Sequence, residues 1–286
     1  MPLADRTLGR ALVLCSALTF SSAGTFTQGL AAGAWQIVFW RGLAAALFTL
    51  AWLALTGRLA AEARAFRASA WAATLAGASG TAAFIAAFKL TDIASVTLIY
   101  GTCPFVTAAL GWLWLGERPG PRVLLASLAA LAGVLTAASG SLGGIGRAGL
   151  PQSLAGDLLA FWMTLMMACL MLVYRRWPKT PAALPPALSQ FLLLPLSLTF
   201  ARPGALPFGP VAVLLVFGLV FAVASVTLSA GARRLPGVET ALLSTLELPF
   251  APLLAFVALA EVPAPRTLLG GAIVLAAVIW SQLPSK

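Results

Sequence analysis

The chain is a succession of long apolar runs separated by short polar stretches. A membrane-spanning α-helix needs roughly 20 consecutive apolar residues, and ten runs meet this requirement. The predicted spans lie near residues 11–31, 35–55, 70–89, 92–115, 122–139, 155–174, 184–201, 210–231, 236–260 and 265–282. The seventh is the weakest because Pro185, Pro186 and Pro195 interrupt it. No polar stretch is long enough for a soluble domain, so the pattern predicts an all-α integral membrane protein with ten transmembrane helices.

Composition agrees with a membrane protein. Hydrophobic residues make up 60% of the chain and charged residues only 9%, whereas a soluble domain carries about 25% charged residues. There is no histidine, and Cys15, Cys103 and Cys169 all lie inside apolar runs, which disfavours a disulfide framework. Without histidine or a cluster of cysteines and acids, we expect no metal site and no cofactor. Membrane topology explains the net charge of +10, so nucleic acid is not an expected partner.

The distribution of Lys and Arg predicts the topology, because cytoplasmic loops collect these residues. With the N-terminus inside, 13 cations fall on the cytoplasmic side and four outside, and Arg41 lies within the second span. The inside set is Arg6, Arg10, Arg58, Arg64, Arg67, Arg118, Arg122, Arg175, Arg176, Lys179, Arg233, Arg234 and Lys286, and the outside set is Lys89, Arg147, Arg202 and Arg266. This bias predicts cytoplasmic N- and C-termini, and it requires an even number of spans.

A cleaved signal peptide in place of the first span is the alternative, since basic residues precede this run and small residues follow it. It would leave nine spans and place the new N-terminus outside. The apolar run is long for a signal peptide. We therefore expect a transmembrane helix there.

The two halves of the chain resemble each other. The stretch "ERPGPR" at 117–122 matches "EVPAPR" at 261–266 with a displacement of 144 residues, and "CPF" at 103–105 echoes "LPF" at 248–250. We predict two repeats, 1–143 and 144–286, each with five spans. An odd number of spans inverts the second repeat in the membrane, an architecture typical of secondary transporters with the substrate site at the midplane. A duplication kept only for packing is the alternative.

A glutamate stands in the middle of the ninth span. The stretch "LSTLELPFAP" at 243–252 places Glu247 about halfway across, beside Pro249 and Pro252. An ionised carboxylate facing lipid there would cost about 2.5–3.5 kcal/mol or more. Glu247 should therefore face a cavity or a partner, or be protonated and bonded to a neighbouring helix. Pro249 also leaves the carbonyl of Thr245 without its helical amide, and such carbonyls are tolerated where they line a cavity. The stretch is interpreted as a kinked wall of a polar site.

The equivalent stretch of the first half is "IYGTCPFVTA" at 99–108. Tyr100 and Thr102 supply hydroxyl groups there, while Pro104 and Gly101 predict a kink. Both halves thus carry a proline at the midplane, but only the second carries an acid. Such asymmetry is expected where a site binds an asymmetric molecule.

Further polar residues lie in the first two spans. Ser21, Thr25 and Gln28 share one helical face in the first span, which suits either helix packing or a cavity wall. Arg41, in the second span, could snorkel outward, pair with an acid, or bind a substrate carboxylate bidentately. We expect an ion pair or snorkelling for Arg41.

One tryptophan differs from the others. Most tryptophans fall near span ends, as interface anchors do, whereas Trp162 lies well inside the sixth span with Met166 one turn on. These two residues form either part of the core or a soft, adaptable cavity surface. The complete set of candidate cavity residues is Ser21, Thr25, Gln28, Arg41, Tyr100, Thr102, Trp162, Met166, Ser244 and Glu247, and the candidate kink or gating residues are Gly101, Pro104, Pro249 and Pro252.

Several motifs in order carry a family resemblance. "FWRGLAAAL", "FKLTDIASVTLI" and "WLWLGERPGPRVLLASLAALAGV" in the first half, and "GDLLAFWMTLMMACLMLVYRR" and "ARRLPGVETALLSTLELPFAPLLAFVALAEVPAPRTLLGGAIVLAAV" in the second, resemble EamA-type members of the drug/metabolite transporter superfamily. The resemblance implies a bundle of ten helices around a central cavity that exports small metabolites, often amino acids, across the bacterial inner membrane. It also implies structural roles for Glu117 and Glu261.

Together these features predict an exporter of neutral or aromatic amino acids that works by alternating access as a monomer. Arg41 or free helix dipoles would bind the carboxylate, Glu247 or hydroxyl groups the ammonium, and Trp162, Met166 and Tyr100 would pack the side chain. A drug or quaternary-cation exporter is the alternative, because an acid in an aromatic cavity suits a cation. A membrane scaffold and an intramembrane enzyme are less favoured, since no nucleophile with a base is evident. The sequence does not specify the energy source.

Overall fold

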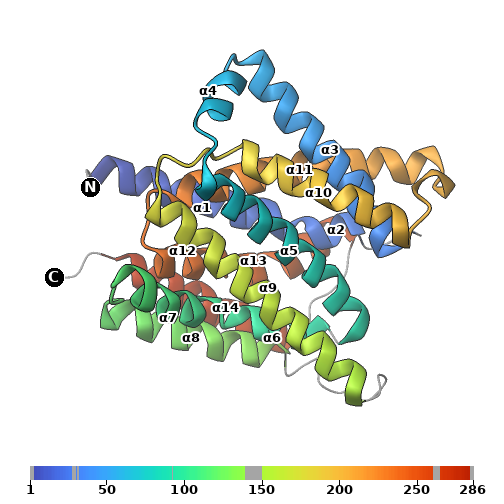
Figure 1. Ribbon diagram of the computed structural model, residues 1–286. Helices are drawn as coiled ribbons and strands as arrows, with labels where there is room; N and C mark the ends of the chain where they lie inside the picture. Colours follow the sequence, from blue (N-terminus) through green and yellow to red (C-terminus); the bar gives the residue numbers. More distant parts are fainter. Residues whose placement is uncertain are drawn as a thin grey trace.

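The computed structural model describes residues 3–27, 30, 32–91, 93–138, 150–259 and 265–283, and within them every regular element is a helix (Figure 1). The α-helices are α1 (Leu3–Ser21), α2 (Ala23–Thr27), α3 (Ala34–Leu55), α4 (Leu59–Arg64), α5 (Ala68–Leu90), α6 (Ile93–Gly101), α7 (Cys103–Leu115), α8 (Pro121–Ala138), α9 (Leu150–Arg176), α10 (Leu184–Phe200), α11 (Phe208–Ala232), α12 (Gly237–Ser244), α13 (Glu247–Leu259) and α14 (Pro265–Gln282). A short 3-10 helix, η2 (Pro203–Ala205), precedes α11.

Helices occupy all ten ranges in which spans are predicted. Seven ranges hold one helix, and three hold two consecutive helices: α1 with α2, α6 with α7, and α12 with α13. By length and hydropathy, four helices can cross a membrane (α3, most of α5, most of α9, and α11), and α7, α8 and α10 are shorter apolar helices. The chain is therefore a helical, multi-pass membrane protein. Ten crossings arranged as two inverted repeats stay a prediction.

The second part of each half follows the same helical pattern. Helices α6, α7 and α8 begin at residues 93, 103 and 121, and α12, α13 and α14 begin at 237, 247 and 265, each 144 residues later. Helices α7 and α13 both contain 13 residues, and α8 and α14 both contain 18. The displacement between the "ERPGPR" and "EVPAPR" stretches therefore also relates the bounds of whole helices.

Glycines allow the closest helix contacts. A Cβ atom on Gly133 of α8 would lie 2.7 Å from the carbonyl oxygen of Gly270 on α14, and one on Gly218 of α11 would lie 2.7 Å from the carbonyl oxygen of Arg41 on α3. Helix α5 likewise packs along α9, and α3 packs against α10 (Figure 1). Small residues at such crossings let helix backbones approach, which is how helices associate inside a bilayer.

The first turn of α1 and the last turn of α14 lie at the same end of the bundle, on the left of Figure 1. Four ion pairs at this end join segments distant in the sequence. Their nitrogen–oxygen distances are 2.7 Å for Arg6–Glu239, 2.8 Å for Arg10–Glu239, 2.8 Å for Arg175–Glu117 and 3.0 Å for Arg234–Asp5. The start of α1 and the end of α14 thus lie on the side of the protein for which most of the cations were predicted. That this side is cytoplasmic stays a prediction.

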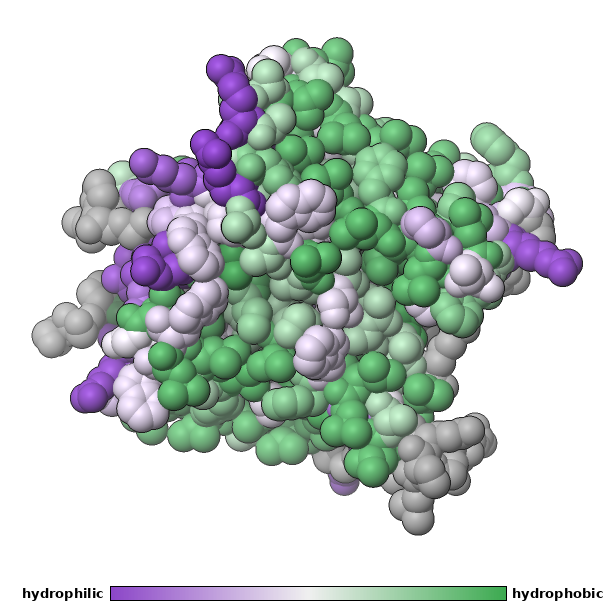
Figure 2. Space-filling view, in the orientation of Figure 1, coloured by the Kyte–Doolittle hydropathy of each residue, from purple (hydrophilic) through white to green (hydrophobic). Residues whose placement is uncertain are grey.

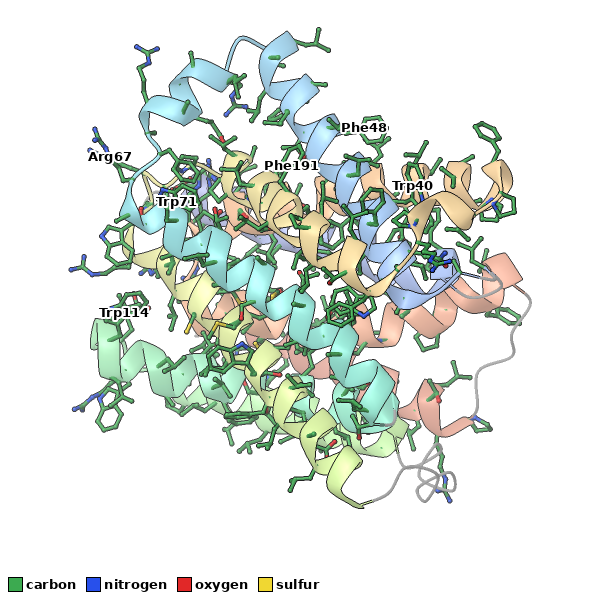
Figure 3. All side chains as sticks on the ribbon, turned by 45° about the vertical axis from the view of Figure 1, so that its right-hand side comes forward. Trp40, Phe48, Arg67, Trp71, Trp114 and Phe191 are labelled. Atoms are coloured by element: carbon green, nitrogen blue, oxygen red, sulfur yellow. The ribbon has the colours of Figure 1, made fainter. Side chains whose placement is uncertain are left out.

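The outer surface is apolar between two polar margins. In Figure 2, hydrophilic side chains gather at the left margin and at a smaller group on the right, and the face between them is largely hydrophobic. Large apolar side chains face outward, among them Leu113 at 74% exposed and Val257 at 81%. Trp71 and Trp114 project at the margin beside Arg67 (Figure 3). An exposed apolar band flanked by tryptophans and cations matches the bilayer and its interfaces.

Candidate functional site

The ninth predicted span is broken in the middle. Helix α12 ends at Ser244 and α13 begins at Glu247, so the break lies upstream of Pro249, which is the third residue of α13. A proline is tolerated in a first turn because the amide there lacks an intrahelical partner in any case. The expectation of a free Thr245 carbonyl is wrong, since the amide of Leu248 donates to it at 3.1 Å. Pro249 therefore lies in the first turn of a half-helix, and Pro252 lies further within that helix.

The fourth predicted span is broken in the same way. Helix α6 ends at Gly101, α7 begins at Cys103, and Pro104 lies in the first turn of α7. At each break, a threonine hydroxyl donates to the carbonyl three residues earlier. Thr102 bonds to Ile99 at 2.6 Å, and Thr245 bonds to Leu242 at 2.7 Å. The hydroxyl of Thr102 is thus occupied by its own helix, where the carbonyl of Ile99 accepts from both the hydroxyl and the amide of Thr102.

Gly101 serves packing at the first break. A Cβ atom at this position would lie 3.0 Å from the side chain of Val134 on α8. The absence of a side chain therefore lets the end of α6 approach α8 closely. Gly101 also stands directly before the break, as its candidacy as a kink residue requires.

The structure brings Glu247 and Tyr100 together. The carboxylate of Glu247 and the hydroxyl of Tyr100 lie within hydrogen-bonding reach, and the thiol of Cys103 is near enough for an electrostatic interaction with the same carboxylate. Glu247 is partly buried and is the first residue of α13, while Cys103 is the first residue of α7. Two half-helix N-termini, which carry partial positive charge, thus meet near one acid.

Hydrophobic side chains surround this pair. Tyr100 packs against two buried clusters, and Met167 contacts both of them. Leu248 and Phe250 pack against the cluster that contains Cys103. The acid and the phenol therefore form a polar spot inside an apolar region, where electrostatic interactions are stronger than in water.

Arg41 is buried without a counter-ion. The residue is 7% exposed, and none of the described residues places a carboxylate within ion-pair distance of it. Its Nη2 atom donates to Oε1 of Gln190 at 3.5 Å, the limit for a hydrogen bond. Its guanidinium carbon lies 4.1 Å from the ring centre of Phe221 and 5.6 Å from that of Phe217. The expected ion pair is therefore not found within the described chain, and the low exposure does not fit snorkelling.

Two further phenylalanines hold these rings. Phe20 of α1 meets Phe221 edge-on with ring centres 5.4 Å apart, and Phe26 of α2 stacks on Phe217 at 5.2 Å. Sequence reasoning missed these phenylalanines and Gln190. The only available signal was the spacing of Phe217 and Phe221, four residues apart on one helix face, and many apolar spans show such spacing.

The candidate face of the first span bonds to its own helix. The Ser21 hydroxyl donates to the carbonyl of Leu18, and the Thr25 hydroxyl donates to that of Ser22, both at 2.6 Å. Gln28 lies outside the described residues. The two hydroxyls therefore satisfy backbone carbonyls around the break between α1 and α2.

Trp162, Met166 and Ser244 make contacts of their own outside the pair formed by Glu247 and Tyr100. Trp162 is 45% exposed, and its indole nitrogen donates to the hydroxyl of Ser79 on α5 at 2.8 Å. Met166 packs at the contact between α5 and α9. Ser244 is buried and donates to the carbonyl of Thr240 at 3.0 Å. The methionine that packs against the same two clusters as Tyr100 is Met167.

Two hollows are lined by described residues at the ends of the bundle. One, of about 290 Å³, lies at the end that carries the ion pairs, and Arg6, Glu117 and Glu239 belong to its wall. The other, of about 220 Å³, lies beside Gln36 and Arg202. Glu117 pairs with Arg175, as a structural residue would, whereas Glu261 lies outside the described residues. The central cavity stays a prediction, and within the described ranges no group of three metal-ligating side chains occurs.

Comparisons with known proteins agree with this architecture. Residues 7–139 match the model of the EamA-like transporter family. A solved crystal structure aligns with 99% of this chain and 98% of its own chain at a TM-score of 0.80, with 16% sequence identity. At that identity the likeness concerns the fold alone. No curated protein matches the sequence.

Proposed function

We propose, from the match between residues 7–139 and the EamA-like transporter family, that this chain exports small zwitterionic metabolites, most of all neutral or aromatic amino acids. The family and the apolar helices make the protein a multi-pass membrane transporter of the drug/metabolite type. The proposal adds the substrate class, the direction and the bacterial inner membrane. It also adds a monomeric protein with both termini in the cytoplasm. These additions rest on the resemblance and on the distribution of cations.

The proposal includes two inverted repeats, 1–143 and 144–286, that exchange roles during alternating access. The displacement of 144 residues between α6–α8 and α12–α14 supports this arrangement. The helix contacts support it as well. Helix α5 packs along α9 as α11 packs along α1, and α3 contacts α11 as α10 contacts α5. Each of these contacts between the halves thus has a counterpart once the halves are exchanged.

A single observation carries the substrate assignment, namely the acid at the meeting point of two broken helices. Glu247 stands at the N-terminus of the half-helix α13, faces Tyr100 and lies near the start of α7. Glu247 and Tyr100 can accept and orient an ammonium group, and the partial positive charge of the two half-helix N-termini favours a molecule that also carries a negative group. A zwitterion satisfies both requirements.

Export from liposomes tests this proposal. The purified protein is reconstituted, the liposomes are loaded with a mixture of labelled amino acids, and the loss of each is followed with and without a pH gradient. We expect a few neutral or aromatic amino acids to leave selectively. Replacing Glu247 by Gln should slow their export by about tenfold or more, corresponding to about 1.4 kcal/mol.

Asp157→Asn is the matched control. Asp157 lies near the N-terminal end of α9, and its carboxylate accepts from the hydroxyl of Thr91 and not from Tyr100. This variant should export at the parent rate. Parent-like export by Glu247→Gln at every pH would remove the binding role of this acid. Liposomes that lose no amino acid, with folded protein present, would refute the substrate class.

The second candidate is a quaternary-cation exporter, which the contact between Glu247 and the ring-bearing Tyr100 favours. Competition separates the two candidates. Inhibition of export by tetraphenylphosphonium, and not by unlabelled amino acids, would support the cation. Arg41 opposes this candidate, because its buried guanidinium and a permanently cationic substrate would together place two positive charges inside the protein.

A further inference from the structure

Arg41 is the one buried arginine side chain of the described residues whose guanidinium has only a neutral partner. It is 7% exposed, its Nε atom has no hydrogen-bond acceptor within the described chain, and its bond to Gln190 is 3.5 Å long. Burying a charged group is costly unless an opposite charge or strong hydrogen bonds compensate for the loss of water. The rings of Phe217 and Phe221 compensate only in part. A bound anion would therefore compensate for the water that the guanidinium has lost.

Packing places this guanidinium firmly. Gly42, the next residue, lies against Gln190 of α10, and Gly218 of α11 lies against the backbone of α3 at Arg41. A side chain at Gly218 would push α11 away from α3. Three helices thus hold Arg41 at a fixed depth, as a binding residue requires.

The orientation leaves the right atoms available. The ring centre of Phe221 lies 4.1 Å from the guanidinium carbon, while the Nε donor of Arg41 has no acceptor within the described chain and is available to a ligand. A carboxylate binds the edge of a guanidinium through two parallel hydrogen bonds. Gln190 supplies only a neutral oxygen at the limit of bonding distance and competes weakly with a carboxylate.

The surrounding rings indicate the rest of the ligand. Phe20 and Phe26, on either side of the break at Ser22, contact the same two rings that Arg41 contacts. An apolar or aromatic body next to the carboxylate would pack against these rings. Displacing the five-residue helix α2 would remove Phe26 from the ring of Phe217, whereas Phe20 of α1 would still contact Phe221.

We propose that Arg41 is the residue that binds the carboxylate of the transported molecule, with Phe217 and Phe221 as the adjoining aromatic wall, so that a compound without a carboxylate is not a substrate. This inference rests on the proposed export function and adds the residue that selects the anionic group. It separates carboxylate-bearing substrates from purely cationic ones.

Ligand-induced stabilisation of the purified full-length protein tests this inference independently of transport. Two probes share a phenyl body: 3-phenylpropionate carries only the carboxylate, and phenethylamine carries only the amine. We expect 3-phenylpropionate to raise the unfolding temperature of the parent protein in a saturable manner. Arg41→Met should weaken this binding by about tenfold or more, because the bidentate contact is lost. Arg41→Lys, which keeps the charge without the fork, should lie between the parent and Arg41→Met.

Arg58→Met is the matched control. Arg58 also lies over an aromatic ring, that of Trp52 at 5.2 Å, but it is exposed in the turn after α3. Each variant is compared with its own ligand-free unfolding temperature, so a change in stability alone does not imitate lost binding. Phenethylamine binding should be the same in Arg41→Met and in the parent.

The outcomes separate the two proposals. Equal affinity of the parent and Arg41→Met for 3-phenylpropionate, or no stabilisation of the parent by this probe, would overturn the role of Arg41. Loss of 3-phenylpropionate binding in Arg41→Met, together with a parent that exports no amino acid, would support Arg41 and refute the export function. Equal weakening by Arg58→Met would show a general effect of removing an arginine and would also overturn the inference.

Discussion

Replacing Glu239 by Gln should loosen the end of the bundle that carries the ion pairs. Glu239 lies in the first turn of α12, its side chain is 4% exposed, and its two oxygens accept from Arg6 at 2.7 Å and Arg10 at 2.8 Å. The arginines belong to α1, so the carboxylate ties the first half of the chain to the second. Loss of its charge therefore weakens a contact between the halves.

The magnitude follows from the exposure of the partners. A hydrogen bond to a charged group contributes about 1.5–3 kcal/mol when buried, and an exposed pair contributes about 0–1 kcal/mol. The side chains of Arg6 and Arg10 are 48% and 30% exposed, so we take about 1 kcal/mol for each bond. Removing both costs about 2 kcal/mol, a shift of about 30-fold between the closed and open forms of this end.

Thiol labelling measures this shift. Val238 is 8% exposed and borders the same hollow as Glu239, so Val238→Cys, in a protein whose native cysteines are replaced by serine, reports on access to it. A membrane-impermeant maleimide should label this cysteine about 30 times faster in the Glu239→Gln protein. The unfolding temperature should fall as well.

Asp5→Asn provides the comparison that can refute this reasoning. Asp5 pairs with Arg234 at 3.0 Å at the same end, but both side chains are partly exposed, at 37% and 26%. Its loss should change the labelling rate by less than about threefold, as for a surface pair. A Glu239→Gln protein that labels at the parent rate, or an equal effect of the two substitutions, would show that burial of this carboxylate does not hold the end closed.

Other predictions follow from packing and hydrogen bonds. Gly218→Val should destabilise the protein by about 1–3 kcal/mol in denaturant unfolding, because its side chain would overlap α3; Gly209→Ala, which meets nothing within 4 Å, should have little effect. Glu62→Gln should lower the free energy of unfolding by about 1 kcal/mol, since the carboxylate accepts from the amides of Leu184 and Ala183 at the start of α10, at 2.7 and 3.1 Å. A Glu62→Gln protein with the free energy of unfolding of the parent would contradict a capping role. The Trp162→Phe protein should export substrate at the parent rate, because Trp162 bonds to Ser79 at the contact between α5 and α9. A change in substrate preference would show that Trp162 lines the substrate cavity.

Local physical chemistry explains which parts of the fold could be predicted. The apolar runs are long because a helix must match the thickness of the bilayer, and helices occupy every one of the predicted ranges. The resemblance to EamA-type transporters is confirmed for residues 7–139, which match the model of that family. The breaks near Pro104 and Pro249 could also be anticipated, since a proline cannot donate in a helix interior.

The details of those breaks needed the structure. Pro249 lies in the first turn of a half-helix. The amide of Leu248 donates to the carbonyl of Thr245, which the proline was expected to leave without a partner. A choice of this kind among neighbouring amides depends on how the two half-helices pack against α14 and α1. The residues of the stretch itself do not specify it.

Sequence alone determined what depends on neighbours along the chain: the helical class, the membrane location, the segments that can span, and the cost that singles out Arg41 and Glu247 as buried charges. Only the tertiary structure decided what each charge faces. Glu247 meets Tyr100 from the other half of the chain, and Arg41 meets Gln190 and Phe221 instead of an acid. These partners lie 147, 149 and 180 residues away along the chain, and side chains so distant become neighbours only when helices of both halves pack together.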